Sequence, residues 1–167
     1  MFKGVVDDFV WACSGVYEPN EDNLRGALWE ELSSMYSRWD TAWCVFGDFN
    51  TIRYPRERLG CEAFSLAMFA FSNFIEDNYL VDLPLKGASF TWFRDSGTNC
   101  MSRIDRILAL VDWVDHFRNV SQRVLTRVVS DHCPLLVVAG NVNEGRSAFK
   151  FENIQLKEEG FVERVVE

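Results

Sequence analysis

The segment Ala42-Trp43-Cys44-Val45-Phe46-Gly47-Asp48-Phe49-Asn50 joins a nearly continuous apolar run to a polar turn. A short apolar run that is stopped by a glycine predicts a strand over 42–46 that is buried on both faces. Asp48 and Asn50 follow it and are two residues apart, so their side chains can point the same way. This pattern predicts a polar site above the sheet edge. The alternative is an ordinary turn, in which Asp and Asn bond nearby backbone N–H groups.

Two helices with one apolar face each are predicted around this segment. Before it, apolar residues recur at steps of three and four, which is the helical period. They are Leu24, Ala27, Leu28, Leu32, Met35 and Trp39. After it, a stripe of Phe64, Met68, Phe71 and Ile75 predicts a second helix over about Phe64 to Asn78. We expect its aromatic side chains to lie in the core.

The other periods are short and predict strands. An apolar run from Phe9 to Val16 precedes the first helix and ends at Tyr17-Glu18-Pro19-Asn20, where proline and asparagine break the strand. Further strands are predicted over Leu80–Leu83, Ser89–Phe93, Ser102–Leu110, Val120–Arg127 and Pro134–Ala139. The expected class is mixed α/β with a β-rich second half. The charged tail carries a weak helical pattern from Leu156 to Val166 and is expected to lie outside the core.

Composition predicts one globular domain. The chain has 167 residues, of which 48% are hydrophobic, and a single core can bury roughly two-thirds of the surface of such a chain. No uncharged run reaches the ~20 residues of a membrane span, and Asp7 and Asp8 do not suit a signal peptide. We therefore expect a soluble intracellular protein with no membrane partner. The five cysteines form no CxxC pair, which argues against a zinc cluster.

Charge is unevenly distributed along the chain. The net charge of -8 argues against a binder that holds nucleic acid by electrostatics alone. Residues 41–143 differ, because their eleven acids meet ten bases, nine of which are arginine. The planar guanidinium suits phosphate oxygens. A phosphate-contacting surface in this region is compatible with the sequence.

Two further motifs carry polar side chains into strands. Ser130-Asp131-His132 offers one hard oxygen ligand for a divalent cation and one imidazole that can hold a phosphate oxygen or a proton. A structural, hydrogen-bonded histidine is the alternative. In Ser102-Arg103-Ile104-Asp105-Arg106 a carboxylate interrupts an apolar strand, and its burial without a partner would cost several kcal/mol. Its partner is either a neighbouring arginine or His132, whose imidazole Asp105 would then orient.

The order of these motifs resembles a known family. Tyr-x-Pro-Asn, a helix, GDFN, a second helix, xFTW, SRIDR and SDHCPL resemble the C-terminal part of the endonuclease/exonuclease/phosphatase superfamily, which has the deoxyribonuclease I-like fold. The set is most similar to the endonuclease region of plant LINE-type retrotransposons. Phe149-Lys150-Phe151-Glu152-Asn153 with Glu159-Gly160-Phe161 is similar to the segment that joins this endonuclease to its reverse transcriptase. The resemblance covers about Val10 to Glu167.

The resemblance implies a fold and a reaction. Residues 9–142 would form a partial endonuclease/exonuclease/phosphatase domain, the C-terminal part of a four-layer α/β sandwich with mixed, largely antiparallel sheets. Residues 143–167 would form a charged, linker-like tail. The implied reaction is hydrolysis of a DNA phosphodiester with Mg²⁺ or Mn²⁺. Tyr17 would contact the phosphate through its hydroxyl.

The resemblance also implies a role for each remaining site residue. Asp48 would orient or deprotonate the attacking water, and Asn50 would form a hydrogen bond beside the scissile phosphate. His132 would stabilise charge on the phosphate, and Asp105 would orient its imidazole. Asp131 would bind the metal, with Asp48 and Asn50 beside it. A hard cation would supply fixed positive charge at the phosphate oxygens.

One part of the family pattern has no match in this sequence. The first half of the family's fold brings an Asn near its start and a metal-binding Glu on a following strand, so we expect the metal to be bound weakly. An inner sheet face without its cover would be apolar, and we expect self-association through it. The alternative function is a non-catalytic remnant with at most weak nucleic-acid or protein binding. Ancestry alone suggests the nucleus as the compartment.

Overall fold

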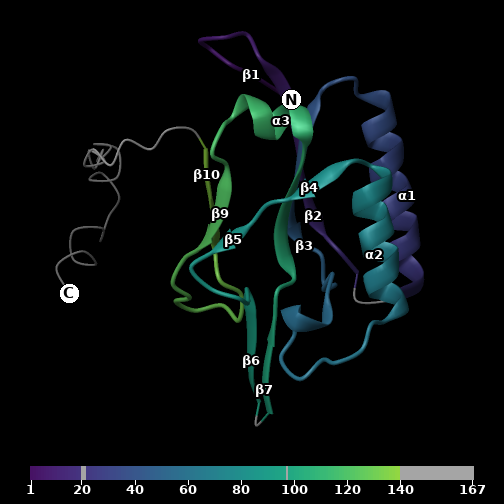
Figure 1. Cartoon of the computed structure of the whole chain (residues 1–167), viewed down its shortest axis with the longest axis vertical. Coiled ribbons are helices and arrows are strands. Elements are labelled where there is room, and N and C mark those ends of the chain that lie inside the picture. Colours follow the sequence, from purple (N-terminus) through teal and green to yellow (C-terminus); the bar gives the residue numbers. More distant parts are fainter. Residues whose placement is uncertain (20–21, 97, 140–167) are drawn as a thin grey trace, which may run out of the picture.

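A five-stranded mixed sheet in the order β1-β2-β3-β8-β4 organises the molecule, and the structure, a computed structural model, describes residues 1–19, 22–96 and 98–139 (Figure 1). β2 and β3 run parallel, with Tyr17 opposite Asp48, and β8 lies antiparallel to β3, with Asp105 also opposite Asp48. Three site residues therefore meet at one edge of the sheet. The strands are β1 (Phe2–Lys3), β2 (Val10–Tyr17), β3 (Ala42–Asp48), β8 (Asp105–Leu110) and β4 (Leu80–Asp82).

Two helices, α1 (Asp22–Arg38) and α2 (Leu66–Asp77), cover one face of this sheet (Figure 1). Aromatic side chains fill the space between them, as in the stacking of Trp29 on Phe74 with ring centroids 4.6 Å apart. The prediction of both helices is confirmed. The second begins at Leu66 rather than at Phe64, because the Ser65 hydroxyl caps it by accepting a hydrogen bond from the Met68 N–H at 3.3 Å.

Smaller elements complete the described fold. A three-stranded sheet contains β10 (Leu135–Val138), β9 (Ser121–Val124) and β5 (Leu85–Lys86). A hairpin is formed by β6 (Trp92–Ser96) and β7 (Thr98–Ser102), and short helices lie at η1 (Pro55–Glu57) and α3 (Val111–His116). Two of the strand pairings in the described residues are parallel, β2 with β3 and β5 with β9. The expected mixed α/β class with largely antiparallel sheets is confirmed.

Several predicted strand limits were wrong. β3 continues through Gly47 to Asp48, because both residues still pair with β2. The strand expected over Ser89–Phe93 lies at Trp92–Ser96, and the one expected over Ser102–Leu110 begins at Asp105. Asp105 therefore starts its strand instead of interrupting it. The second strand of the hairpin, β7, was not predicted, since Thr98–Ser102 carries no apolar period.

Other elements were shorter than predicted or not predicted. The strands predicted over Val120–Arg127 and Pro134–Ala139 are shorter in the structure, where they are β9 and β10. The elements β1, β5 and α3 were not predicted. β1 and β5 are two-residue strands, and such lengths carry no measurable period. The tail over 143–167 and its helical pattern lie outside the described residues. No described helix is long and apolar enough to cross a bilayer.

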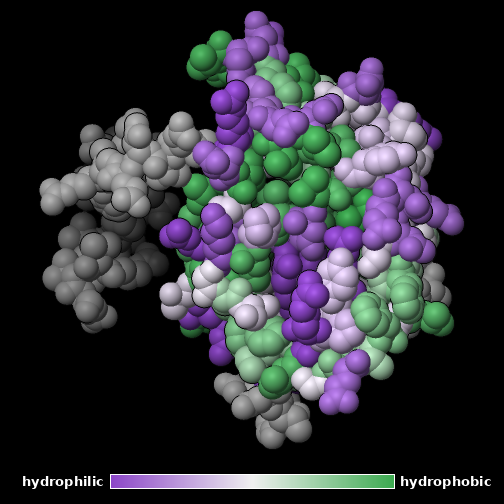
Figure 2. Space-filling view, viewed as in Figure 1, coloured by the Kyte–Doolittle hydropathy of each residue, from purple (hydrophilic) through white to green (hydrophobic). Residues whose placement is uncertain are grey.

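The second face of the five-stranded sheet borders an apolar cavity of about 530 Å³ beneath the smaller sheet. It is lined mainly by Trp11, Cys13, Cys44, Phe46, Ile107, Trp113, Cys133, Leu135 and Val137. Figure 2 shows apolar side chains gathered between the helical layer and the β9–β10 side of the molecule, with hydrophilic residues around them. All five cysteines are free, and the Cys13 and Cys44 sulfur atoms lie 3.5 Å apart in this cavity wall.

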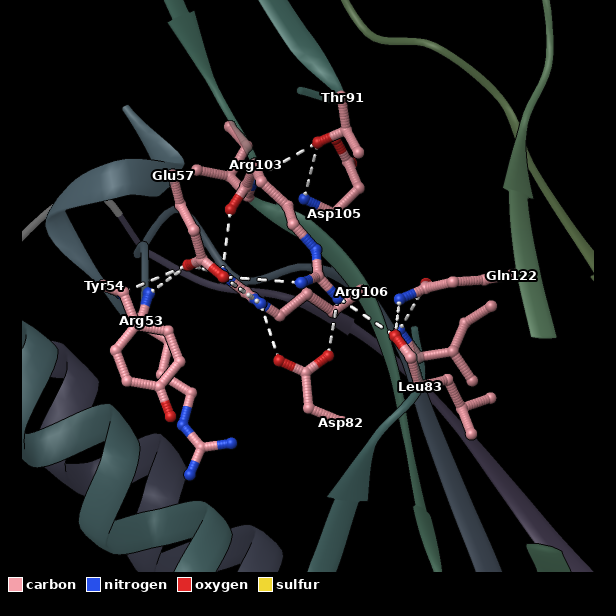
Figure 3. A network of polar contacts seen from close by, with 12 residues as sticks. Arg53, Tyr54, Glu57, Asp82, Leu83, Thr91, Arg103, Asp105, Arg106 and Gln122 are labelled. Carbon is pink, nitrogen blue, oxygen red and sulfur yellow. Dashed lines mark hydrogen bonds and ion pairs between the residues drawn. The ribbon is translucent and has the colours of Figure 1, made fainter. Parts of the chain in front are cut away.

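A buried ionic network ties the loop after β3 to β8 (Figure 3). The Glu57 carboxylate accepts hydrogen bonds from both terminal nitrogens of Arg106, from Arg103, and from the backbone N–H groups of Arg53 and Tyr54. Asp82 accepts from Arg103 and Arg106, at 2.7 Å each. Two acids thus balance two arginines, which satisfies charges that would otherwise be costly to bury.

Candidate functional site

The end of β3 is shaped so that Asp48 and Asn50 both reach one pocket. Gly47 has φ +145°, and a Cβ there would lie 1.9 Å from the Val16 carbonyl oxygen, so only glycine fits. Asp48 Oδ1 accepts the Asn50 N–H at 2.8 Å, and Asn50 Nδ2 donates to the Glu18 carbonyl at 2.6 Å. Asp48 Oδ2 and Asn50 Oδ1 are left for the pocket. The residues form the ordinary turn and the polar site at once.

Asp105 and His132 form a pair. Nδ1 of His132 lies 3.1 Å from both carboxylate oxygens of Asp105, so this nitrogen carries the proton of the neutral ring and Nε2 faces the pocket. The Thr91 hydroxyl accepts the Asp105 N–H at 3.0 Å, and the Thr91 carbonyl accepts the Cys133 N–H at 2.7 Å. Buried Thr91 therefore joins the two segments that carry the pair.

The open alternatives for the Asp105 partner are thereby resolved. Arg103 and Arg106 pair with Glu57 and Asp82 rather than with Asp105. His132 is the partner, and its imidazole is held by a carboxylate on one nitrogen while the other nitrogen remains directed at the remaining acids.

Two further carboxylates approach the outer nitrogen of the imidazole. Asp48 Oδ2 lies 3.9 Å and Asp131 Oδ1 lies 4.0 Å from Nε2 of His132. Asp131 Oδ2 accepts the indole N–H of Trp92 at 2.9 Å. That hydrogen bond is the main reason why the pKa of Asp131 lies below its usual value. Asp131 is therefore ionised at neutral pH.

The pKa of Asp48 is shifted in the opposite direction to that of Asp131. Burial raises the pKa of Asp48, and the nearby charges of Asp105 and Asp131 add to this, against the lowering effect of the Asn50 N–H and of His132. Ionising Asp48 is thus less favourable in the folded protein than in water. A raised pKa of an acid in a pocket is a typical feature of a functional site.

One cavity of about 400 Å³ collects these groups. Its lining includes all the predicted site residues except Asp105, which stands behind His132. Tyr17 lies at the rim with 76% of its surface exposed. Three arginines that were not predicted as site residues, Arg25, Arg58 and Arg94, also line the cavity. The complete lining consists of Tyr17, Arg25, Asp48, Asn50, Arg58, Trp92, Arg94, Ser102, Ile104, Asp131 and His132.

The donor set fits a divalent cation. Ligand atoms of Asp48, Asp105 and His132 all lie within 4.8 Å of one another. Carboxylate and amide oxygens suit Mg²⁺ and Mn²⁺, and the imidazole suits the softer of the two. Because Asp105 uses both oxygens on Nδ1 of His132, we regard Asp48, Asn50 and Asp131 as the more available oxygen donors.

Comparison with known proteins finds similarity in structure rather than in sequence. No protein-family model matches the chain, and no curated protein sequence matches it. The endonuclease domain of TRAS1, a telomere-specific non-LTR retrotransposon, superposes with a TM-score of 0.62 at 14% identity, covering 84% of this chain and 61% of that domain. The 3′ phosphatase NExo from Neisseria, solved with a product DNA hairpin, superposes with a TM-score of 0.56 at 23% identity, covering 71% of this chain and 52% of the phosphatase.

A beta toxin from Staphylococcus aureus gives a TM-score of 0.52 at 16% identity, covering 74% of this chain and 50% of the toxin. The chain thus spans between about half and three-fifths of these three proteins. These likenesses confirm the deoxyribonuclease I-like fold that the motif order predicted. A fold of this kind hosts several reactions, so the function has to be argued from the site.

Proposed function

We propose that this deoxyribonuclease I-like chain hydrolyses phosphodiester bonds in DNA with Mg²⁺ or Mn²⁺. One observation carries the proposal: the Asp105–His132 pair and the carboxylates of Asp48 and Asp131 converge on a cavity that arginines also line. Acids without basic partners would suit a structural cation, and arginines without acids would suit simple phosphate binding. The cavity combines both, which suits the hydrolysis of a phosphodiester.

Each side chain has a role that its geometry supports. Asp48 lines the cavity, and burial raises its pKa, so its carboxylate would accept the proton of a water molecule that attacks the phosphorus. Nε2 of His132 faces the same pocket and would donate a hydrogen bond to a phosphate oxygen when the ring is protonated. Asp105 fixes the ring plane through its contacts to Nδ1. A cation held by Asp48, Asn50 and Asp131 would add fixed positive charge at the phosphate oxygens.

The arginines account for the binding of a polyanion by an acidic chain. Arg58 and Arg94 lie on the cavity wall, and their guanidinium groups suit the oxygens of a nucleic-acid backbone. DNA as the substrate is supported by what the similar structures are named for: an endonuclease domain and a phosphatase solved with a DNA hairpin.

A non-catalytic remnant of the fold is the second candidate. It is favoured by the apolar cavity of about 530 Å³ on the second face of the sheet. In that case the chain would bind DNA or protein weakly and would self-associate through this face. Both candidates rest on the same fold and differ in whether the bond is cleaved.

Nicking of a supercoiled plasmid tests the proposal. The wild-type chain should convert supercoiled to relaxed DNA with Mg²⁺ or Mn²⁺ and not with EDTA. Asp48→Asn should lower the rate by about 10²- to 10⁴-fold. Asp112→Asn is the matched control, since Asp112 is exposed on α3 and outside the cavity lining. Equal, background-level cleavage by wild type and both variants would refute hydrolysis and leave the remnant.

A further inference from the structure

Trp92 contacts the site through a single polar atom. Its indole N–H donates to Asp131 Oδ2 at 2.9 Å, and no other tryptophan in the described residues bonds a carboxylate. The role that the family resemblance implies for Asp131 says nothing of what holds this side chain in place. Asp131 is 60% exposed on its side chain, so an unsupported carboxylate here would sample several rotamers.

Apart from the Trp92 indole, the contacts of Asp131 do not fix the orientation of its carboxylate. The Ser130 hydroxyl lies 3.4 Å from Asp131 Oδ1, which is long for a hydrogen bond between oxygens. The Asp131 carbonyl accepts the Phe93 N–H at 2.9 Å, and Trp92 pairs with His132 in a β-bridge. The backbone thus fixes the register of the two segments, and the indole fixes the carboxylate.

The indole is itself immobilised. Its ring packs against the buried cluster of Ile52, Met68 and Ile104, and the Arg94 guanidinium lies 5.4 Å from its centroid. A donor held by packing loses little entropy when it forms its hydrogen bond. Since Oδ2 is engaged with the indole, Oδ1 is the oxygen that faces His132 and the pocket.

We propose that Trp92 is a positioning residue of the cation site: its indole N–H holds Asp131 Oδ2 so that Oδ1 is presented to a divalent cation. The inference rests on the proposed function, because it needs the cation. It assigns Trp92 to metal affinity rather than to the bond-breaking step. Partners of metal ligands commonly change metal affinity 10- to 100-fold when they are removed.

Direct Mn²⁺ binding to the full chain, followed by calorimetry and by electron paramagnetic resonance of free Mn²⁺, tests the proposal without relying on cleavage. Trp92→Phe should raise the dissociation constant for Mn²⁺ about 10- to 100-fold. Trp113→Phe is the matched control and should leave it unchanged. Trp113 is buried on α3, and its indole N–H has no partner among the described residues.

A second pair of variants separates positioning from packing. β-(3-Benzothienyl)alanine at position 92 keeps the ring shape and replaces the N–H by sulfur, so it should weaken Mn²⁺ binding as Trp92→Phe does even if the phenylalanine variant folds poorly. In Asp131→Asn, adding Trp92→Phe should have no further effect on Mn²⁺ affinity, because the indole acts through Asp131.

The outcomes are distinct. Wild-type Mn²⁺ affinity in both position-92 variants would overturn the inference while leaving the proposed hydrolysis intact. So would additive losses in the double variant, since Trp92 would then act by another route. A wild-type chain that neither binds Mn²⁺ nor nicks DNA would refute the proposed function, and the positioning role with it.

Discussion

Replacing Glu57 by glutamine should destabilise the fold strongly. Glu57 lies at the centre of the network in Figure 3, where its carboxylate accepts hydrogen bonds from two arginines and two backbone N–H groups. Its side chain is 7% exposed and that of Arg106 is fully buried, so water screens this pair little. Glu57→Gln leaves two arginines to one acid, Asp82.

The magnitude follows from that imbalance. Removing one partner of a buried ion pair costs about 3–5 kcal/mol, because the other charge is left uncompensated. For a domain of this size such a loss lowers the melting temperature by roughly 6–20 °C. The control is Glu76→Gln: Glu76 pairs with Arg53 at 3.2 Å, but its side chain is 67% exposed, so the pair contributes about 1 kcal/mol at most.

Chemical denaturation of the three proteins at pH 7 and pH 4 provides the assay. Burial alone would raise the pKa of Glu57, but the hydrogen bond and charge of Arg106 outweigh it and hold the pKa below its usual value. The stabilisation is therefore present at neutral pH and is lost as the pH falls through the folded-state pKa. The Gln variant should lose less stability between the two pH values than wild type. A Glu57→Gln loss within 1 kcal/mol of Glu76→Gln would refute the reasoning.

Three further predictions concern the site. Because the pKa of Asp48 is raised mainly by burial, the ionised carboxylate opposes folding. Asp48→Asn should therefore increase the free energy of unfolding, measured with denaturant, by about 0.5–2 kcal/mol at pH 7 and leave it unchanged at pH 3. A decrease at pH 7 would contradict this. Asp105→Asn should lower plasmid nicking about 10²-fold or more, since His132 loses its orienting charge; an unchanged rate would exclude that role. Gly47→Ala should lower the free energy of unfolding, measured by thermal denaturation, by more than about 1 kcal/mol. Gly26→Ala should instead stabilise α1, because nothing lies within 4 Å of the added Cβ. Equal effects of the two substitutions would contradict the close packing of Gly47 against β2.

The parts of the fold that the sequence predicted are those with a strong apolar period. α1, α2 and β3 bury continuous stripes or runs, so burial alone specifies them. β7 escaped prediction and β6 was displaced because the hairpin is held by strand pairing and by the hydrogen bond from the Phe93 N–H to the distant Asp131 carbonyl. Such contacts between distant segments leave no local pattern.

The candidate site was predicted where spacing carries geometric information. Asp48 and Asn50, two residues apart at a strand end, do reach one pocket, and Asp105 does meet His132. The arginines of the cavity were not predicted as site residues, since nothing in the local sequence separates Arg58 from Arg53 or Arg103. Arg53 forms an ion pair with the exposed Glu76, and Arg103 belongs to the buried network around Glu57. Only the tertiary structure assigns each guanidinium to its partner.

The two histidines of the chain offer the most direct test of the central claim, that one pocket built around His132 performs metal-dependent phosphodiester hydrolysis. His116 lies on α3, where its Nε2 pairs with Asp7 at 3.1 Å, and it is absent from the cavity lining. The measurement is the rate of Mg²⁺-dependent plasmid nicking by His132→Gln and by His116→Gln in the full chain. The account predicts a loss of about 10²- to 10⁴-fold for His132→Gln and the wild-type rate for His116→Gln. Equal rates in the two variants would contradict it.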